Sequence, residues 1–223
     1  MSRETRNAWN SAGVTIIRRS ADDSSAIVKT IRLHNGRGLI NAGNLHTDLS
    51  NIGVPVFNSH DSIRSVSTAT ALRRTLGDYL PSDSLTGPHW HKSRGFRGDG
   101  KVFHTTRSAY CLSVGGDVQQ HVDGVEFRVN TVGSVIVQAH KKLLTDTIGN
   151  FIWEWCGVDG IRANGIIPLI KEAANSIPNF EHTVFGWDII VGSDGPRVIE
   201  INTSPGVNEP TARRIAGQIR KVI

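Results

Sequence analysis

Residues 186–206 read GWDIIVGSDGPRVIEINTSPG and predict a β-hairpin, because two apolar-rich runs flank the turn sequence GSDGP. The register follows from the turn: if Val191 pairs with Arg197, Asp188 lies directly opposite Glu200. The hairpin therefore predicts two carboxylates side by side on neighbouring strands, and this feature decides both the expected fold and the expected chemistry.

The same hairpin face carries a third polar side chain. Asn202 shares a face with Glu200, because residues two apart in a strand point to the same side, and it faces Gly186, which leaves room. Paired carboxylates repel each other, and Mg²⁺ with phosphate oxygens would offset that repulsion. Asp188, Glu200 and Asn202 are therefore candidate metal ligands. The alternative is the plain solvent-facing side of a hairpin whose other side is apolar. That apolar side would carry Trp187, Ile189, Val191, Ile199 and Ile201.

The composition of the 223 residues excludes several classes of protein. Val, Ile and Leu suffice to build a core, which excludes a disordered tail, and no run of about 18 apolar residues could span a membrane. Cys111 and Cys156 are too far apart in the sequence to form the disulfide scaffold of a chain this long. The polar N-terminus is no secretory signal. We therefore expect a reduced, cytoplasmic protein without membrane contact. The net charge of +5 suggests an anionic ligand or partner.

Short strands, hairpins and helices alternate along the chain without repeats. This mixture favours an α+β fold over a doubly wound parallel sheet. Hydrophobic periodicity and turn residues place the individual elements. We expect strands at 14–17, 26–33 and 53–57, one helix over 61–76, a hairpin over 125–137, and helices over 166–177 and from 210 onward.

Positive charge concentrates in residues 87–107, which hold five of the 25 Lys and Arg but only one acid, Asp99. Residues 95–101 have the G-x-x-x-x-G-K spacing of a phosphate-binding P-loop, but Val102 stands where Ser or Thr should follow. We therefore do not interpret this segment as a P-loop. It could still bind phosphate, because a glycine-rich turn can present N–H groups and cations to phosphates. The alternative is a solvated surface loop.

A further signal lies in the predicted strand that begins at 125, where Glu126 and Arg128 share one face. Taken alone, this pair would be an ordinary surface ion pair, which contributes little to stability. The residues before it, 118–124, predict a short strand that enters a turn.

Together these features resemble the ATP-grasp superfamily over roughly residues 58–210. The order matches: a basic glycine-rich loop, a linker strand, an acidic-x-Arg strand, and a hairpin with Asp followed by Glu-x-Asn. The most specific part, EINTSPG at 200–206, resembles the magnesium-binding end of carboxylate–amine ligases such as ribosomal-protein glutamate ligases, D-alanine–D-alanine ligases and glutathione synthetases. The resemblance implies two α+β subdomains that enclose a nucleotide.

The resemblance also implies roles for single residues. Asp188, Glu200 and Asn202 would hold two Mg²⁺ ions, with Mn²⁺ as a substitute. Arg128 and Lys92 would be catalytic, with Arg128 at the γ-phosphate and Lys92 at the α- or β-phosphate of ATP. Further nucleotide contacts would come from Arg97, Gly98, Gly100 and Lys101 in a lid loop, Gln119, Gln120, His121 and Val122 in a hinge at the adenine, Glu126 at the ribose, and Lys141 at a phosphate. Asn164 would be a weaker candidate beside the metal.

The implied activity is an ATP-dependent ligase that joins a carboxylate to an amine, or to a thiol, through an acyl phosphate and releases ADP and phosphate. Its substrates would be small molecules or peptides, acidic or nucleic-acid-linked ones included, and the protein could form homo-oligomers. Two alternatives stay open. One is the same fold acting as a kinase or phosphoryl transferase, and the other is a basic nucleic-acid-binding module without catalysis.

The expected organisation is a short N-terminal α/β segment, 1–57, followed by an ATP-grasp domain, 58–223. Within that domain, 58–117 would form the lid subdomain and 118–223 the metal-binding subdomain. The N-terminal segment is shorter than the α/β domain usual in the family, so the sequence does not define the substrate. A phosphate-binding Lys that relatives carry early in the helix is missing here, and Arg73 is the nearest substitute.

Overall fold

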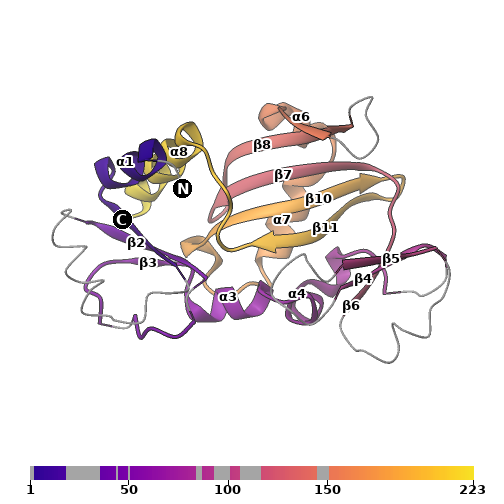
Figure 1. Cartoon of the computed structure of the whole chain (residues 1–223), viewed down its shortest axis with the longest axis horizontal. Helices are drawn as coiled ribbons and strands as arrows, with labels where there is room; N and C mark the ends of the chain where they lie inside the picture. Colours follow the sequence, from indigo (N-terminus) through magenta and orange to yellow (C-terminus); the bar gives the residue numbers. More distant parts are fainter. Residues whose placement is uncertain are drawn as a thin grey trace.

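The computed structural model contains three β-sheets and a mixture of helices, which confirms the α+β prediction. Figure 1 shows the largest sheet between two smaller units at the ends of the molecule. The structure describes residues 3–18, 36–43, 45–49, 51–83, 87–92, 101–105, 117–144 and 151–223. The strand predicted at 26–33 lies outside these residues. Among the described residues, no helix is both long and apolar enough to cross a membrane.

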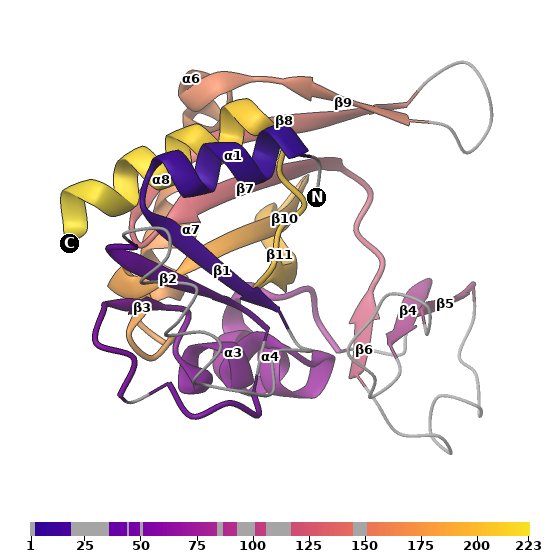
Figure 2. The same ribbon diagram turned by 60° about the vertical axis from the view of Figure 1, so that its left-hand side comes forward.

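The N-terminal unit combines both ends of the described chain. Strands β1 (Val14–Arg18), β2 (Gly38–Ala42) and β3 (Val56–Phe57) form a parallel sheet. Helix α1 (Arg3–Ser11) lies along α8 (Glu209–Val222), as Figure 2 shows. One apolar core joins them, because buried residues of α1, the strands and α8 belong to a single cluster. The C-terminal helix therefore packs with the N-terminal strands.

Two short helices stand where the sequence predicted a single helix over 61–76. They are α3 (His60–Val66) and α4 (Ala69–Leu76), followed by the 3₁₀ turn η1 (Gly77–Tyr79). The single-helix prediction is wrong, because Thr68 adopts an extended conformation and its side chain accepts a hydrogen bond from the N–H of Ala71 at 3.1 Å. A Thr at this position starts a new helix instead of continuing the old one.

The third sheet, called the lid sheet after the role that the sequence predicts for this region, is antiparallel, with strand order β5-β4-β6. It consists of β4 (His89–Lys92), β5 (Lys101–His104) and β6 (Asp117–Gln120). Cross-strand pairing puts Lys92 opposite both Lys101 and Asp117. The lid sheet lies at the end of the molecule away from the N-terminal unit in Figures 1 and 2.

The main sheet has five antiparallel strands in the order β11-β10-β7-β8-β9. The strands are β7 (Val125–Val132), β8 (Val135–Leu144), β9 (Phe151–Trp155), β10 (Val184–Gly192) and β11 (Gly195–Asn202). Helices α6 (Gly157–Ala163) and α7 (Ile166–Ala174) and the turn η3 (Phe180–His182) connect β9 to β10. One face of the sheet packs against α7 and α4 in a shared apolar core. The other face carries the polar side chains and, at Val132 and Val184, packs with α8.

The hairpin β10–β11 confirms the pairs that matter for the candidate metal ligands. Asp188 lies opposite Glu200, and Gly186 lies opposite Asn202. Strand β10 also pairs with β7 on its other side, which places Asp188 opposite Arg128. Three polar side chains therefore sit in one row across three strands.

Closer to the turn, the predicted register is wrong by one residue. Val191 pairs with Pro196 rather than Arg197, because a β-bulge leaves Ile199 as an extra residue on β11. The bulge also changes which side chain faces the core. Val198 is fully buried in the core, whereas Ile199, which we expected on the apolar face, is half-buried.

Candidate active site

The three predicted metal ligands come together on the polar face of the main sheet. Asp188 and Glu200 are cross-strand neighbours, and the Nδ2 atom of Asn202 donates a hydrogen bond to Oδ2 of Asp188 at 3.3 Å. The Oδ1 atom of Asn202 keeps its acceptor capacity, because an amide oxygen has its own lone pairs. The arrangement thus supplies carboxylate and amide oxygens from two strands.

Arg128 forms a two-pronged ion pair with Asp188. Its Nε donates to Oδ1 at 2.7 Å and its NH2 group donates to Oδ2 at 2.9 Å. The guanidinium also stacks over the ring of Trp153, 4.6 Å from the ring centre. This fixed geometry holds a cation directly beside the predicted metal ligands.

Burial and charge oppose each other at this pair. Burial raises the pKa of Asp188, the bonds from Arg128 lower it, and the nearby carboxylates of Glu200 and Glu126 raise it. The hydrogen bond to Asp188 raises the pKa of Arg128, against the lowering effect of burial. The carboxylate at Asp188 therefore depends on a nearby positive charge to stay ionised.

The donor set fits a hard divalent cation. Mg²⁺ prefers oxygen ligands, and one or two carboxylates with substrate phosphates usually complete its shell. Asp188 is buried beside Glu200, so a bound cation would stabilise both carboxylates. Asp188, Glu200 and Asn202 are thus the residues that could hold magnesium.

A residue that the sequence analysis missed completes this corner of the site. Asn130 lies on β7 opposite Gly186, and its buried Oδ1 has no hydrogen-bond partner among the described residues. A Cβ atom on Gly186 would lie 2.8 Å from Cβ of Pro205 and 3.1 Å from that same Oδ1. The space opposite Asn202 is therefore filled by the chain that follows Asn202. Asn130 lies two residues after Arg128. The alternation that places Glu126 and Arg128 on one face of the strand therefore also predicts Asn130 on that face.

Lys142, rather than Lys141, is the lysine of β8 on the face of Arg128. Its Nζ lies 2.6 Å from Oε2 of Glu126, the residue predicted to bind ribose. Lys141 pairs with Phe127, whose side chain belongs to the apolar core. Cross-strand partners share a face, so Lys141 emerges on the side opposite to Arg128, contrary to its expected role at a phosphate.

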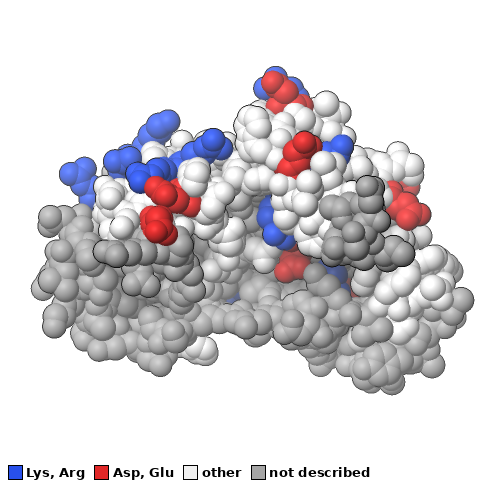
Figure 3. All heavy atoms as spheres, turned by 45° about the horizontal axis from the view of Figure 1, so that its top comes forward, with Lys and Arg blue, Asp and Glu red and all other residues white. Residues whose placement is uncertain are grey.

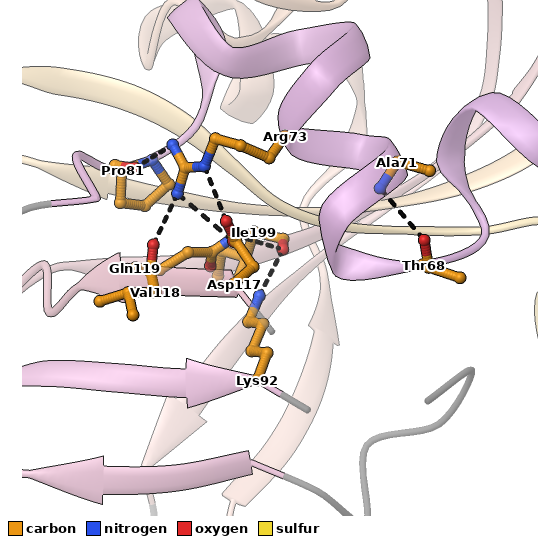
Figure 4. A network of polar contacts seen from close by, with 9 residues as sticks. All are labelled: Thr68, Ala71, Arg73, Pro81, Lys92, Asp117, Val118, Gln119 and Ile199. Carbon is orange, nitrogen blue, oxygen red and sulfur yellow. Dashed lines mark hydrogen bonds and ion pairs between the residues drawn. The ribbon is translucent and has the colours of Figure 1, made fainter. Parts of the chain in front are cut away.

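Two side chains of the lid sheet contact the same carbonyl group of the main sheet. Nζ of Lys92 donates to the carbonyl oxygen of Ile199 at 2.7 Å, and Nε2 of Gln119 approaches it at 3.5 Å, as Figure 4 shows. Ile199 is the bulged residue, so the irregularity of β11 presents the carbonyl that receives Lys92. Lys92 is 7% exposed and lies between the two sheets.

Arg73 fixes the lid sheet to α4. Its guanidinium donates to Asp117 at 3.0 Å and to the carbonyl oxygens of Pro81 and Val118 at 2.8 Å each, a network drawn in Figure 4. These contacts engage three sides of the guanidinium within the protein. Arg73 therefore makes structural contacts, whereas we expected it to take the place of the missing phosphate-binding Lys.

The hinge residues connect the two sheets. Gln119 and Gln120 end β6, and His121 and Val122 lead on toward β7. The N–H groups of Gln120 and His121 already donate within the protein, to the carbonyls of Ser82 at 2.7 Å and Pro88 at 2.9 Å. A base bound here would thus rely on other groups of the hinge.

An aromatic cluster borders the hinge. Trp90 and Phe103 are cross-strand partners with ring centres 4.9 Å apart, and the ring of His121 lies 5.3 Å from that of Phe103. Trp90 shares a strand face with Lys92 and is 37% exposed. The lid face that contacts the main sheet at Lys92 therefore continues into an accessible aromatic surface, which the sequence analysis did not identify.

The remaining predicted residues contribute less to this geometry. Arg97, Gly98 and Gly100 lie outside the described residues, and Lys101 starts β5 opposite Lys92. Asn164 ends α6, where its Nδ2 donates to the carbonyl of Gly160 at 2.7 Å. Figure 3 shows both signs of charge inside a hollow near the middle of the molecule, and Lys and Arg gathered over its α8 end.

No family model matches the sequence, and comparison with curated proteins gives no significant match. Solved structures do match. A D-alanine–D-alanine ligase from Bacillus anthracis complexed with ATP is 12% identical, with a TM-score of 0.64 over 91% of this chain and 86% of that one. The ATP-grasp ligase PsnB, complexed with minimal precursor, Mg and ADP, is 12% identical, with a TM-score of 0.59 over 94% and 97%. A RimK domain ATP-grasp protein from Sphaerobacter thermophilus DSM 20745 is 14% identical, with a TM-score of 0.56 over 92% and 98%.

Proposed function

We propose, from the ATP-grasp fold that this chain shares with these structures, that it is an ATP-dependent ligase that releases ADP. The observation that carries the proposal is the row of Arg128, Asp188 and Glu200 across three strands, with Lys92 of the lid sheet donating to the neighbouring residue Ile199. This row combines metal-binding oxygens with fixed cations, as phosphoryl transfer requires.

The nucleotide would lie between the lid sheet and the main sheet. Lys92 and Arg128 are proposed to contact its phosphates, and Glu126, held by Lys142, its ribose. The exposed aromatic face of Trp90 and Phe103 suits the purine ring, because aromatic rings stack on nucleobases. Arg97, Gly98, Gly100 and Lys101 remain proposed phosphate contacts, as do Gln119, Gln120, His121 and Val122 at the base.

Asp188, Glu200 and Asn202 are proposed to hold magnesium, as two ions. When bound, the metal would neutralise charge on the phosphates and orient the transferred phosphoryl group. Arg128 already lies against Asp188 and would turn its remaining N–H groups to the phosphoryl oxygens. Arg and Mg²⁺ together supply the electrostatic stabilisation that dominates such reactions.

The proposed reaction has two steps. A substrate carboxylate oxygen attacks the γ-phosphorus of ATP, the bond between that phosphorus and the bridging oxygen breaks, and ADP leaves. The amine nitrogen of a second substrate then attacks the carbonyl carbon of the acyl phosphate, the carbon–oxygen bond breaks, and inorganic phosphate leaves as the nitrogen loses a proton. Arg128 and Lys92 would hold the phosphoryl oxygens throughout, so catalysis rests on positioning and charge.

Asp188→Asn is expected to lower ADP release at least 100-fold, because it removes a metal-binding charge that catalysis needs. ADP release would be measured over a panel of carboxylic acids and amines, including amino acids and peptides, with hydroxylamine added to trap the acyl phosphate. Asp194→Asn is the matched control, because Asp194 lies exposed in the β10–β11 turn and should retain full activity.

Full activity in Asp188→Asn would overturn the proposed metal site. A stable phosphorylated product that forms without any amine would instead identify a kinase. Absence of nucleotide turnover with every substrate mixture would reject the ligase proposal.

A further inference from the structure

A pocket lies outside the site described so far. It has a volume of about 390 Å³ and lies between α1, strands β1 and β2, and the loop that leads from β11 to α8. Figure 2 shows α1 above β1, alongside α8. The volume falls within the range of about 300–1,000 Å³ typical of small-molecule sites.

The lining of this pocket is apolar with a few hydrogen-bonding groups. Ile16, Ile40, Val184 and Ile215 supply apolar walls, and none of the described residues that line it is charged. Moving an unpaired charge into such surroundings is strongly unfavourable. The pocket therefore suits an uncharged, largely apolar group and disfavours an acidic one.

Trp9 adds one specific polar feature. It lines the pocket and is 3% exposed, and its indole Nε1 has no hydrogen-bond partner among the described residues. The indole nitrogen can only donate, and a buried donor without an acceptor is unfavourable and rare in native proteins. The nitrogen itself has almost no accessible surface, so a small movement of the indole would bring its N–H to a hydrogen-bond acceptor that a ligand places at this wall.

The pocket borders the chain segment that leaves the candidate active site. Thr203, which lines it, directly follows the proposed metal ligand Asn202 in the chain. Asn58 fixes two walls of the pocket relative to each other, because its Nδ2 donates to the carbonyl oxygens of Thr203 at 3.0 Å and Val184 at 3.1 Å. A molecule in this pocket would thus lie beside the loop that leaves the metal ligands.

We propose that this pocket binds the side chain of an amino acid or peptide substrate, that this side chain is uncharged and largely apolar, and that it carries a hydrogen-bond acceptor for Trp9. The inference rests on the proposed ligase function, since it assigns the substrate class of that same site. The proposal also narrows the earlier expectation that the substrates include acidic ones, because an acidic side chain does not fit these walls.

The test measures binding without turnover. Ligand-observed NMR would follow N-acetyl-tyrosine amide, N-acetyl-phenylalanine amide and N-acetyl-glutamate amide with the wild-type chain. Trp9→Phe keeps an aromatic ring but removes the N–H, and Ala42→Leu adds bulk to a buried lining residue. Trp155→Phe is the matched control, because Trp155 is 61% exposed and does not line the pocket.

The wild-type chain should bind the tyrosine and phenylalanine probes and not the glutamate probe. Trp9→Phe should weaken the tyrosine probe by about fivefold, the usual effect of one hydrogen bond, and leave the phenylalanine probe unchanged. Ala42→Leu should weaken both probes, and Trp155→Phe neither. The proposal is overturned if the glutamate probe binds as well as the tyrosine probe, if none of the probes binds, or if Trp9→Phe and Ala42→Leu both leave binding unchanged.

Calorimetry with a non-hydrolysable ATP analogue and Mg²⁺ separates this proposal from the proposed function. All three variants should bind the nucleotide like the wild-type chain, which also establishes that they are folded. A wild-type chain that binds the probes but not the nucleotide would reject the ligase proposal and keep the pocket as a binding site.

Discussion

At the scale of single residues, the ion pair between Arg128 and Asp188 governs the electrostatics of the site. Both charges are held in place on neighbouring strands, and Trp153 supports the guanidinium from the side. An Arg with two parallel bonds to a carboxylate is fixed in direction as well as in charge. The positive charge therefore stands beside the proposed metal ligands in the folded chain itself.

The pKa of His140 depends in part on this positive charge. Burial lowers its pKa, and the charges of Arg128 and Arg214 lower it further. Arg214→Gln removes one of these charges, so the pKa of His140 should rise toward its ordinary value. An NMR titration of the imidazole would measure the change.

Arg213→Gln is the control for this titration, because Arg213 pairs with Glu209 at 2.6 Å and does not act on His140. A pKa that stays constant in Arg214→Gln would show that the charge of α8 does not reach the polar face of the main sheet.

At the scale of elements, the hairpin that carries the ligands shows what a sequence pattern can and cannot predict. The turn pairing assumed from the sequence, Val191 with Arg197, is wrong. It nevertheless placed Asp188 opposite Glu200, because the bulge at Ile199 restores the predicted pairs from Glu200 onward. The hairpin sequence alone did not predict the bulge at Ile199, and the hydrogen bond that its carbonyl accepts comes from Lys92, about 100 residues away in the chain. The same limit explains Lys142, because two adjacent lysines give no sign of which one faces the site.

The turn from the hinge into β7 depends on a close approach between two elements. A Cβ atom on Gly124 would collide with the carbonyl oxygen of Val191 on β10. Gly124→Ala should therefore lower the free energy of unfolding by roughly 1–3 kcal/mol, as overpacking does. Urea denaturation would measure the loss.

Gly217→Ala provides the opposite control for the hinge variant. Gly217 lies inside α8, and an added Cβ there meets nothing within 4 Å. Ala favours helix over Gly, so the stability should rise by roughly 0.5–1 kcal/mol. Equal effects of the two substitutions would contradict the proposed packing of the hinge.

At the scale of the whole molecule, one buried side chain joins the N-terminal unit to the main sheet. Asn58 adopts a left-handed conformation with φ of 60° and is fully buried. Its amide donates to Asn41 of β2, Val184 of β10 and Thr203, and its Oδ1 accepts from the N–H of Val184 at 2.6 Å. Loss of this side chain would leave several buried backbone groups unpaired.

Asn58→Gly should destabilise the protein by about 3 kcal/mol or more, because Gly keeps the backbone conformation but removes every one of these bonds. Asn179→Gly is the matched control, since Asn179 has φ of 53° and is exposed, and should change little. Thermal unfolding would compare the two. Similar melting temperatures for both variants would show that the N-terminal unit and the main sheet are not coupled through Asn58.

The assembly of the whole molecule was the least predictable feature from sequence. Local patterns indicated strand 14–17 and the helix that begins near 210, and both are present as β1 and α8. Their packing against each other could not be inferred, because the sequence of an amphipathic element does not show which other element it packs against. Long-range contacts of this kind must be read from the structure itself.

The pairing of α1 with α8 has a consequence for biosynthesis. About 200 residues separate the two helices. A ribosome adds about 5–20 residues per second, so α8 is made roughly 10–40 s after α1. During that interval Trp9, Ile40 and Phe57 lack the helix that covers them in the finished protein. Until α8 has been made, the nascent chain therefore presents apolar surface that the folded protein covers.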